Sequence, residues 1–247
     1  MRAGYRPRHH GFGGRIYSLS WILPGARQWD NAEMKQNLTE RCQEVPLEAK
    51  AEPGAIQDAP VASRVWDQDT PVFLVGLMGA GKTTVGKGLA RALAREFLDL
   101  DHELEARCGV KIPVIFEIEG EEGFRKRESQ VLDDCTQKRN IVLATGGGAV
   151  MNPDNRQALK TRGVVIYLRA SVEELYRRTG RDKNRPLLAT GDARATLKRL
   201  LDLRDPLYRE VADITVDTGS VSVATLVQQI VDLLHTTDFN KPCTSSM

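Results

Sequence analysis

The chain has 247 residues, of which 41% are hydrophobic and 28% are charged, and its formal net charge is +2. This composition is typical of a globular protein with one large or two small domains, and so small a charge does not indicate a nucleic-acid partner. No apolar run approaches the roughly 20 residues that span a bilayer, so a membrane protein is not expected. The four cysteines are scattered without a C-x-x-C pair. That pattern indicates neither a zinc knuckle nor a disulfide framework, and it favours a reducing, cytoplasmic location.

Residues 1–69 differ in composition from the rest of the chain. The first thirty residues hold five arginines against one acid, and residues 43–71 hold four prolines. This composition favours a disordered extension that ends in a flexible linker. Two other interpretations stay open. The Arg-rich, acid-poor start also fits an organelle-targeting peptide, and Met34 could be the native start. At the other end, residues 237–247 are expected to form a frayed tail.

The stretch from 76 to 84 reads G-x-x-x-x-G-K-T-T, the phosphate-binding loop of P-loop proteins. An apolar strand is predicted before it and a helix after it, which is the context the motif needs. Glycines let backbone N–H groups converge on phosphate oxygens, and the N-terminus of the helix adds its own donors. Lys82 is expected to reach the β- and γ-phosphates, and the Thr83 hydroxyl to bind Mg²⁺. The alternative to a phosphate-binding loop is a glycine-rich turn that links a strand and a helix by chance.

Beyond this loop the chain alternates strands and helices. Strands are predicted over 72–75, 96–101, 141–145, 164–168 and 214–216. Helices are predicted over 84–93, 102–108, 113–119, 120–137, 153–161, 193–210 and 223–234, and Ser171 with Glu174 forms a capping box for one more. Such alternation predicts an α/β fold with a doubly wound parallel sheet. Ligands bind such sheets at the carboxyl ends of the strands.

Two acids and three glycines follow predicted strands. Asp99 and Asp101 lie two apart in an extended segment, so their side chains are expected to point the same way. Beside a Mg–nucleotide site, one would serve the metal and the other the acceptor hydroxyl. Alternatively, one of the two acids simply caps the helix that begins near His102. Gly146–Gly148 would allow backbone N–H groups to approach a ligand closely, whereas a plain turn needs only one glycine.

Two basic features are ambiguous when taken alone. Arg125 fits a charged helical face, with Glu121 and Glu128 within reach along the helix. The polar stretch over about 179–192 fits either a solvated basic loop or a lid that closes on the triphosphate and excludes water. Its basic residues are Arg177, Arg178, Arg181, Lys183 and Arg185.

Six motifs in a fixed order resemble those of shikimate kinases. They are GLMGAGKTT (76–84), DLD (99–101), GEEGFRKRE (120–128), ATGGGA (144–149), RPLL (185–188) and RDPLY (204–208). The resemblance spans about 70–235 and implies a kinase domain over 70–236. It implies a three-layer P-loop NTPase fold like that of nucleoside-monophosphate kinases, with a five-stranded parallel sheet, a substrate-binding helical segment and a mobile lid. The implied reaction transfers the γ-phosphate of ATP to the 3-hydroxyl of shikimate, in the pathway to chorismate and aromatic amino acids.

The resemblance also implies roles for single residues. The implied ATP-binding residues are Gly79, Ala80, Gly81, Lys82, Thr83, Thr84, Arg178 and Arg185. The implied shikimate-binding residues are Asp101, Arg125, Gly147 and Arg204, with both arginines on the carboxylate, which a guanidinium fork suits. The implied catalytic residues are Lys82, Asp101 and Arg125, and Glu128 would orient Arg125. One Mg²⁺ per subunit would be bound by Thr83 and Asp99.

Some features depart from the family pattern or leave rivals open. The loop 217–220 lacks the basic residue that some members carry there, so no nucleobase contact is assigned. A gluconate-kinase-like enzyme of the same fold is one rival. The other is a non-catalytic P-loop module that senses shikimate or nucleotide and acts through the N-terminal arm. No predicted surface helix is apolar enough to require burial against a second subunit, so a monomer is expected.

Overall fold

The computed structural model describes residues 67, 69–179, 192–219, 221–237 and 239. At its centre lies a five-stranded sheet in the order β2-β3-β1-β4-β5, and every neighbouring pair of strands is parallel. The strands are β1 (Val72–Val75), β2 (Glu96–Asp99), β3 (Ile141–Ala144), β4 (Val164–Arg169) and β5 (Ile214–Asp217). The predicted five-stranded parallel sheet is confirmed.

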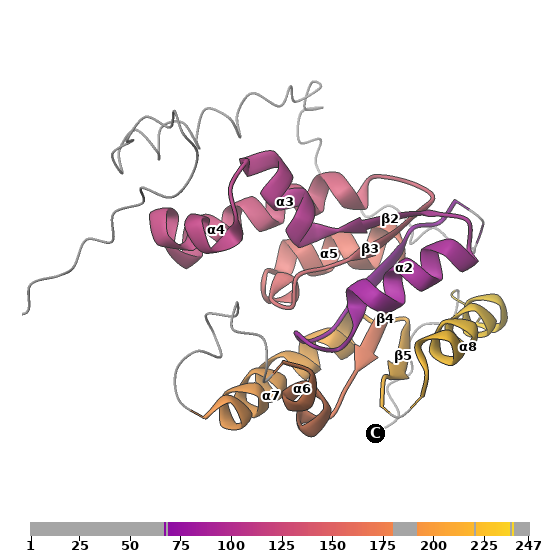
Figure 1. The fold of residues 1–247 in the computed structure, drawn as a ribbon. Coiled ribbons are helices and arrows are strands. Elements are labelled where there is room, and N and C mark those ends of the chain that lie inside the picture. Colours follow the sequence, from indigo (N-terminus) through magenta and orange to yellow (C-terminus); the bar gives the residue numbers. More distant parts are fainter. Residues whose placement is uncertain (1–66, 68, 180–191, 220, 238, 240–247) are drawn as a thin grey trace, which may run out of the picture.

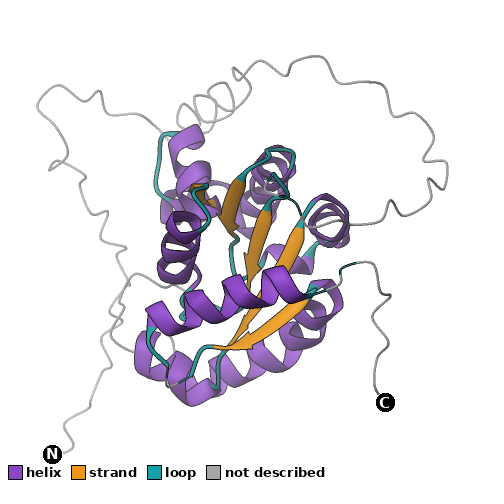
Figure 2. Cartoon of the chain, turned by 90° about the vertical axis from the view of Figure 1, so that its right-hand side faces the viewer, coloured by secondary structure: helices purple, strands orange, loops and turns teal. Residues whose placement is uncertain are grey.

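Helices lie on both sides of the sheet (Figures 1 and 2). They are α2 (Lys82–Ala92), α3 (Leu100–Cys108), α4 (Ile112–Thr136), α5 (Pro153–Arg162), α6 (Val172–Thr179), α7 (Ala193–Val211) and α8 (Val223–Thr236), with a short 3₁₀ turn at Ala149–Met151. Because helices cover both faces, every residue of β1 and β3 is buried, which explains their unbroken apolar sequences. The fold is therefore the expected three-layer α/β arrangement.

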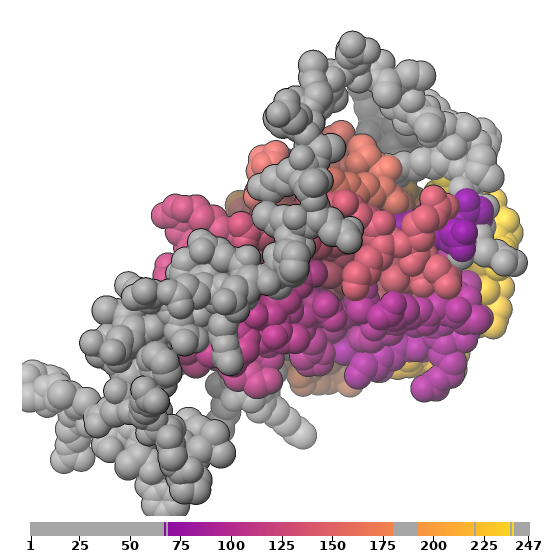
Figure 3. Space-filling model, turned by 90° about the horizontal axis from the view of Figure 1, so that it is seen from above, coloured from indigo at the N-terminus to yellow at the C-terminus, as the bar shows by residue number. Residues whose placement is uncertain are grey.

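Helices α2 and α8 pack against each other, and the yellow atoms of α8 adjoin the violet early part of the described chain in Figure 3. Helix α2 also lies very close to the sheet. A Cβ atom added at Gly86 would lie 2.5 Å from Cε2 of Phe97 on β2. This close packing fixes the start of α2, and with it the phosphate-binding loop, against the sheet.

Helix α4 joins two helices that the sequence predicts separately. They meet at Gly120, whose φ of 70° and ψ of −172° are not helical. Only glycine adopts such a conformation readily, so the chain bends there. Across the bend, the Arg127 guanidinium pairs bidentately with the Glu119 carboxylate, with N–O distances of 2.7 and 2.6 Å. The ion pair fixes the angle between the two halves.

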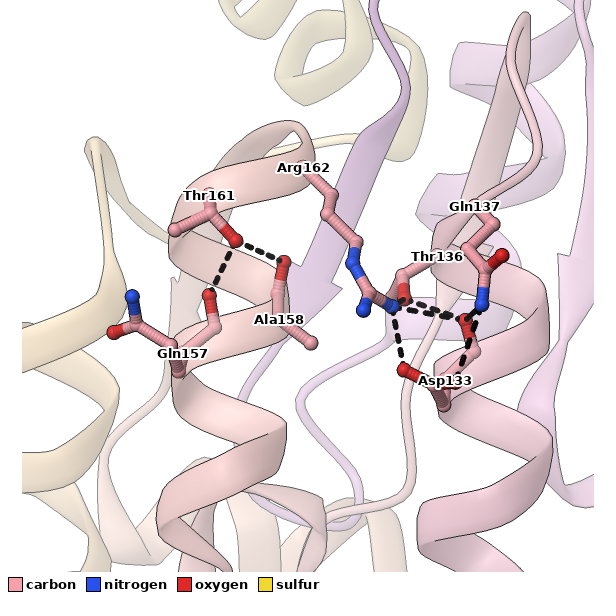
Figure 4. A network of polar contacts seen from close by, with 7 residues as sticks. All are labelled: Asp133, Thr136, Gln137, Gln157, Ala158, Thr161 and Arg162. Atoms are coloured by element: carbon pink, nitrogen blue, oxygen red, sulfur yellow. Dashed lines mark hydrogen bonds and ion pairs between the residues drawn. The ribbon is translucent and has the colours of Figure 1, made fainter. Parts of the chain in front are cut away.

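The carboxyl end of α4 is held by α5 (Figure 4). Nη1 of Arg162 donates to the Asp133 carbonyl at 3.0 Å, to the Asp133 carboxylate at 2.7 Å and to the Thr136 hydroxyl at 2.7 Å. The last carbonyls of a helix lack partners within the helix, and a basic side chain satisfies them. The contact fixes the half of α4 that carries Arg125.

The folded region begins with residues that belonged to the predicted linker. Arg95, only 9% exposed, donates to the Asp67 carbonyl at 3.1 Å and to the Thr70 carbonyl. The Asn140 N–H donates to the Asp69 carbonyl at 2.9 Å. The rest of the arm lies outside the described residues, as do 180–191 of the predicted lid, including Arg185, and nearly all of the tail. Within the described ranges, no helix has the length and apolarity needed to cross a membrane.

Candidate active site

The loop between β1 and α2 has the backbone of a phosphate cradle. Gly76, Gly79 and Gly81 all have positive φ, and Gly81 caps α2 without a side-chain hydrogen bond. The first N–H groups of the helix therefore have no side-chain cap, which leaves them for an anion. Nζ of Lys82 donates to the Gly76 carbonyl at 2.8 Å and to the Leu77 carbonyl at 3.2 Å. Its ammonium group therefore lies against the backbone of the phosphate-binding loop.

Thr83 and Asp99 form a pair at the carboxyl end of β2. The Thr83 hydroxyl donates to Oδ2 of Asp99 at 2.7 Å. The other carboxylate oxygen accepts the Asp101 N–H at 3.2 Å, so Asp99 is the N-cap of α3. The hydroxyl and carboxylate that the sequence assigns to the metal therefore already lie side by side.

The expected geometry of Asp101 is wrong. Strand β2 ends at Asp99, and Asp101 lies in the first turn of α3, so strand alternation does not orient its side chain. The alternative that one of the two acids caps the helix is confirmed, and the cap is Asp99. Oδ1 of Asp101 nevertheless lies 3.3 Å from where a Cβ atom of Gly146 would be. The first turn of α3 therefore places this carboxylate beside the turn formed by Gly146–Gly148, which we call the glycine turn.

Each glycine of the turn after β3 makes room for a different neighbour. A Cβ atom at Gly146 would lie 2.4 Å from Oε1 of Glu128, and one at Gly148 would lie 2.4 Å from Nη1 of Arg125. A Cβ atom at Gly147 would lie 3.3 Å from the backbone nitrogen of Met78 in the phosphate-binding loop. The three glycines therefore bring the charged side chains of α4 and the phosphate cradle to one point.

Arg125 and Glu128 form a half-buried ion pair beside this turn. Nη1 of Arg125 donates to Oε2 of Glu128 at 2.7 Å, and Nη2 donates to Glu121 at 3.3 Å. Glu128 is 2% exposed, and burial raises the pKa of its carboxyl although the charge of Arg125 opposes that shift. Burial acts to lower the pKa of Arg125, but the charge and hydrogen bond of Glu128 outweigh it and raise that pKa. Glu128 therefore orients the guanidinium, as expected.

Arg204 reaches the same turn from α7. Its side chain is only 6% exposed, and Nη1 donates to the Gly147 carbonyl at 3.1 Å. The Tyr208 hydroxyl donates to the same carbonyl at 2.5 Å. Nε of Arg204 is the buried side-chain nitrogen that lacks a partner among the described residues. An unpaired buried donor costs about 1–3 kcal/mol, so a ligand acceptor at this position would be stabilising.

Arg178, at the end of α6, bridges the phosphate-binding loop and the segment after β5. Its guanidinium donates to the Gly79 carbonyl at 3.3 Å, to the Thr218 hydroxyl at 3.1 Å and to the Thr218 carbonyl. Arg178 therefore lies beside the phosphate-binding loop. The capping box that starts this helix is confirmed, with the Ser171 N–H on Glu174 at 3.1 Å and the Glu174 N–H on Ser171 at 3.3 Å.

The structure thus gathers nearly all sequence-predicted site residues around one edge of the sheet. The residues that lie there are Gly79, Ala80, Gly81, Lys82, Thr83, Thr84, Asp99, Asp101, Arg125, Gly147, Arg178 and Arg204. Arg185 is outside the described residues. Sequence reasoning missed Tyr208, although it ends the RDPLY motif and lies one helical turn after Arg204. No cluster of three or more metal-ligating side chains occurs in the described ranges.

Comparison with known proteins assigns the family. A family model described as shikimate kinase matches residues 78–235. The chain belongs to the shikimate kinase family. The shikimate kinase of Bordetella pertussis is 70% identical over 167 residues, which cover 68% of this chain and 79% of the relative. That of Bordetella avium is 59% identical over 199 residues, 81% of this chain and 95% of the relative. This second alignment is longer than the chain from Asp67 to its last residue, so it includes part of the arm.

Solved shikimate kinases have the same fold. The enzyme from Acinetobacter baumannii in complex with shikimate has a TM-score of 0.66 and 53% identity, covering 67% of this chain and 93% of that one. The enzyme from Aquifex aeolicus has a TM-score of 0.60 and 37% identity, covering 67% and 96%. Membership of the shikimate kinase family confirms the predicted resemblance and the predicted phosphotransferase. It does not support the two rival interpretations.

Proposed function

We propose that this member of the shikimate kinase family transfers the γ-phosphoryl group of ATP to the 3-hydroxyl of shikimate, giving shikimate 3-phosphate and ADP. The observation that carries the proposal is the glycine turn. One short backbone segment touches the phosphate-binding loop through Gly147, and it meets Arg125, Asp101 and Arg204 on its other sides. A donor phosphate and an acidic, hydroxylated acceptor would therefore meet at this point.

On the nucleotide side, the N–H groups of the phosphate-binding loop and Lys82 would bind the β- and γ-phosphates. Thr83 and Asp99 supply oxygen ligands 2.7 Å apart at the start of α2, and such hard donors fit Mg²⁺. When bound, Mg²⁺ would neutralise charge on the phosphates. Arg178 would flank the nucleotide, and Arg185 is proposed to approach from the lid.

On the acceptor side, Arg125 and Arg204 would bind the shikimate carboxylate. Both guanidinium groups border the glycine turn, and the planar fork of a guanidinium matches a carboxylate bidentately. The unpartnered Nε of Arg204 provides a donor for one carboxylate oxygen. Asp101 would position or deprotonate the 3-hydroxyl that attacks the γ-phosphorus. Lys82 would offset charge on the transferring phosphoryl group, and Arg125 would offset the charge of the acceptor carboxylate.

The proposed partners are shikimate and ATP alone, and the proposed working form is a monomer in the cytoplasm. The kinase domain is proposed to span 70–236, with 1–69 as an extension and 237–247 as a tail. Size-exclusion chromatography with light scattering would test the oligomeric state.

A coupled assay of ADP release tests the reaction. ATP and Mg²⁺ are supplied with shikimate, with gluconate or with no acceptor. Turnover is expected with shikimate only, because gluconate cannot present a ring hydroxyl and a carboxylate in the same geometry. An absence of shikimate-dependent turnover in active, folded protein would refute the proposal, and turnover with gluconate would favour a gluconate kinase.

A further inference from the structure

The Gly147 carbonyl has two hydrogen-bond donors from the same helix. The Tyr208 hydroxyl lies 2.5 Å from this oxygen and Nη1 of Arg204 lies 3.1 Å from it. A carbonyl oxygen has two acceptor lone pairs, so both are used. Gly147 therefore has only its N–H left to offer an acceptor. Of the two donors, Arg204 is proposed above to bind shikimate, and Tyr208 has no role in that proposal.

Tyr208 is held rigidly. Its side chain has no exposed surface, and its ring stacks on Tyr167 of β4 with the ring centroids 5.0 Å apart. The Tyr167 hydroxyl donates to Asp205 at 2.8 Å, so its own hydrogen bond goes to a residue other than Gly147 or Arg204. Burial raises the pKa of Tyr208, so its hydroxyl stays protonated and remains a donor. The hydroxyl thus has a fixed position set by the sheet.

Gly147 lies between the two halves of the crevice. On one side, a Cβ atom there would lie 3.3 Å from the Met78 nitrogen and 3.6 Å from the Gly76 carbonyl oxygen, both in the phosphate-binding loop. On the other side, its carbonyl binds Arg204 and Tyr208 of α7. The Gly147 peptide group therefore links α7 to the phosphate-binding loop.

We propose that Tyr208 is a positioning residue for the acceptor, an inference that rests on the proposed function. Its hydroxyl holds the Gly147 carbonyl, which places the Gly147 N–H and the Arg204 guanidinium at a fixed distance from the phosphate-binding loop. Without the hydroxyl, Arg204 alone would restrain that carbonyl, and the guanidinium that should bind the carboxylate would be less well fixed. Since a misplacement of about 1 Å can reduce rates a hundredfold, the restraint matters for catalysis.

The test compares Tyr208→Phe with Tyr167→Phe in the full-length protein. Each variant loses one buried hydroxyl and keeps the stacked rings, but only the first removes a contact to Gly147. For Tyr208→Phe we expect kcat/KM for shikimate to fall about tenfold, mainly through a higher KM for shikimate, with the KM for ATP changed less than about twofold. Tyr167→Phe should keep both KM values.

A shikimate analogue that lacks the carboxylate gives a second readout. Its binding should be weakened less by Tyr208→Phe than that of shikimate, because it does not use Arg204. The rise in melting temperature on adding shikimate should be smaller for Tyr208→Phe than for Tyr167→Phe, and this measurement also works if a variant is destabilised. Equal effects of the two variants, or equal losses for shikimate and the analogue, would overturn the inference. Wild-type turnover with shikimate tests the proposed function separately, because it does not depend on either variant.

Discussion

At the level of single residues, Asp101 is the carboxylate that we propose acts on the acceptor hydroxyl. It lies in the first turn of α3, and its carboxylate faces the glycine turn. We expect Asp101→Asn to lower kcat by about 10²–10⁴-fold, because an amide cannot accept the proton. Nucleotide affinity should stay nearly unchanged, since the N–H that Asp99 accepts is part of the backbone. Steady-state kinetics and nucleotide titration would measure the two effects.

Glu103→Gln is a matched control for that substitution. It removes an acid from the same first turn of α3, but the charge of Glu103 acts near Cys135 of α4, where it adds to the rise in the thiol pKa that burial mainly causes. It should therefore leave kcat within about twofold, as surface-type changes usually do. If Asp101→Asn were also within a few-fold of wild type, Asp101 would not be the group that activates the hydroxyl.

The two arginines proposed to bind the shikimate carboxylate lead to a separate prediction. Arg125→Ala and Arg204→Ala should each weaken shikimate binding by about 2–5 kcal/mol, because each removes one partner of a desolvated charge pair. A derivative without the carboxylate should bind wild type and variants about equally. Isothermal titration would measure these affinities, with Lys126→Ala as the control because Lys126 is 72% exposed and pairs with Glu122. Discrimination that persists with the derivative would refute the carboxylate assignment.

At the scale of elements, α4 depends on one backbone conformation. Gly120 lies in a region of φ and ψ that is nearly restricted to glycine, and a Cβ atom there would have no neighbour within 4 Å. Gly120→Ala should therefore destabilise the protein by about 1–3 kcal/mol through backbone strain alone. Urea denaturation would measure this loss. A substitution at the exposed Glu122 should stay within about 0.5 kcal/mol, and an equally small effect of Gly120→Ala would mean that α4 can straighten without strain.

The errors of the sequence-based prediction also lie at element boundaries. The strand that was expected to reach Asp101 ends at Asp99, because the Asp99 carboxylate caps α3 and starts the helix at Leu100. An aspartate just before a helix is a recognisable cap signal, and the sequence predicted that one of the two acids could be the cap without deciding which. The sequence predicted the break within α4. It did not predict the Glu119–Arg127 ion pair, because only the bend brings these two side chains together.

At the scale of the whole molecule, the alternation of apolar strands with helices was enough to predict the sheet and the edge that carries the site. Strand order is not encoded by any local pattern, and it is this order that puts β1 at the centre with β3 and β4 beside it. Contacts between residues far apart in the sequence could not be predicted either. The meeting of Tyr208 with Gly147 links residues 61 positions apart, and no periodicity reports such a contact.

The boundary of the kinase domain can be tested by truncation. Because Arg95 is buried against the carbonyls of Asp67 and Thr70, we expect a chain that starts at Asp67 to keep the stability and kcat/KM of the full-length protein. A chain that starts at Pro71 leaves the Arg95 guanidinium without these acceptors and should be less stable by about 1–3 kcal/mol. Urea denaturation and the shikimate assay would compare the three chains. The Bordetella avium alignment reaches into the arm, so a loss of activity in the chain that starts at Asp67 would show that the arm contributes to the kinase, and equal stability of both truncated chains would refute the role given to Arg95.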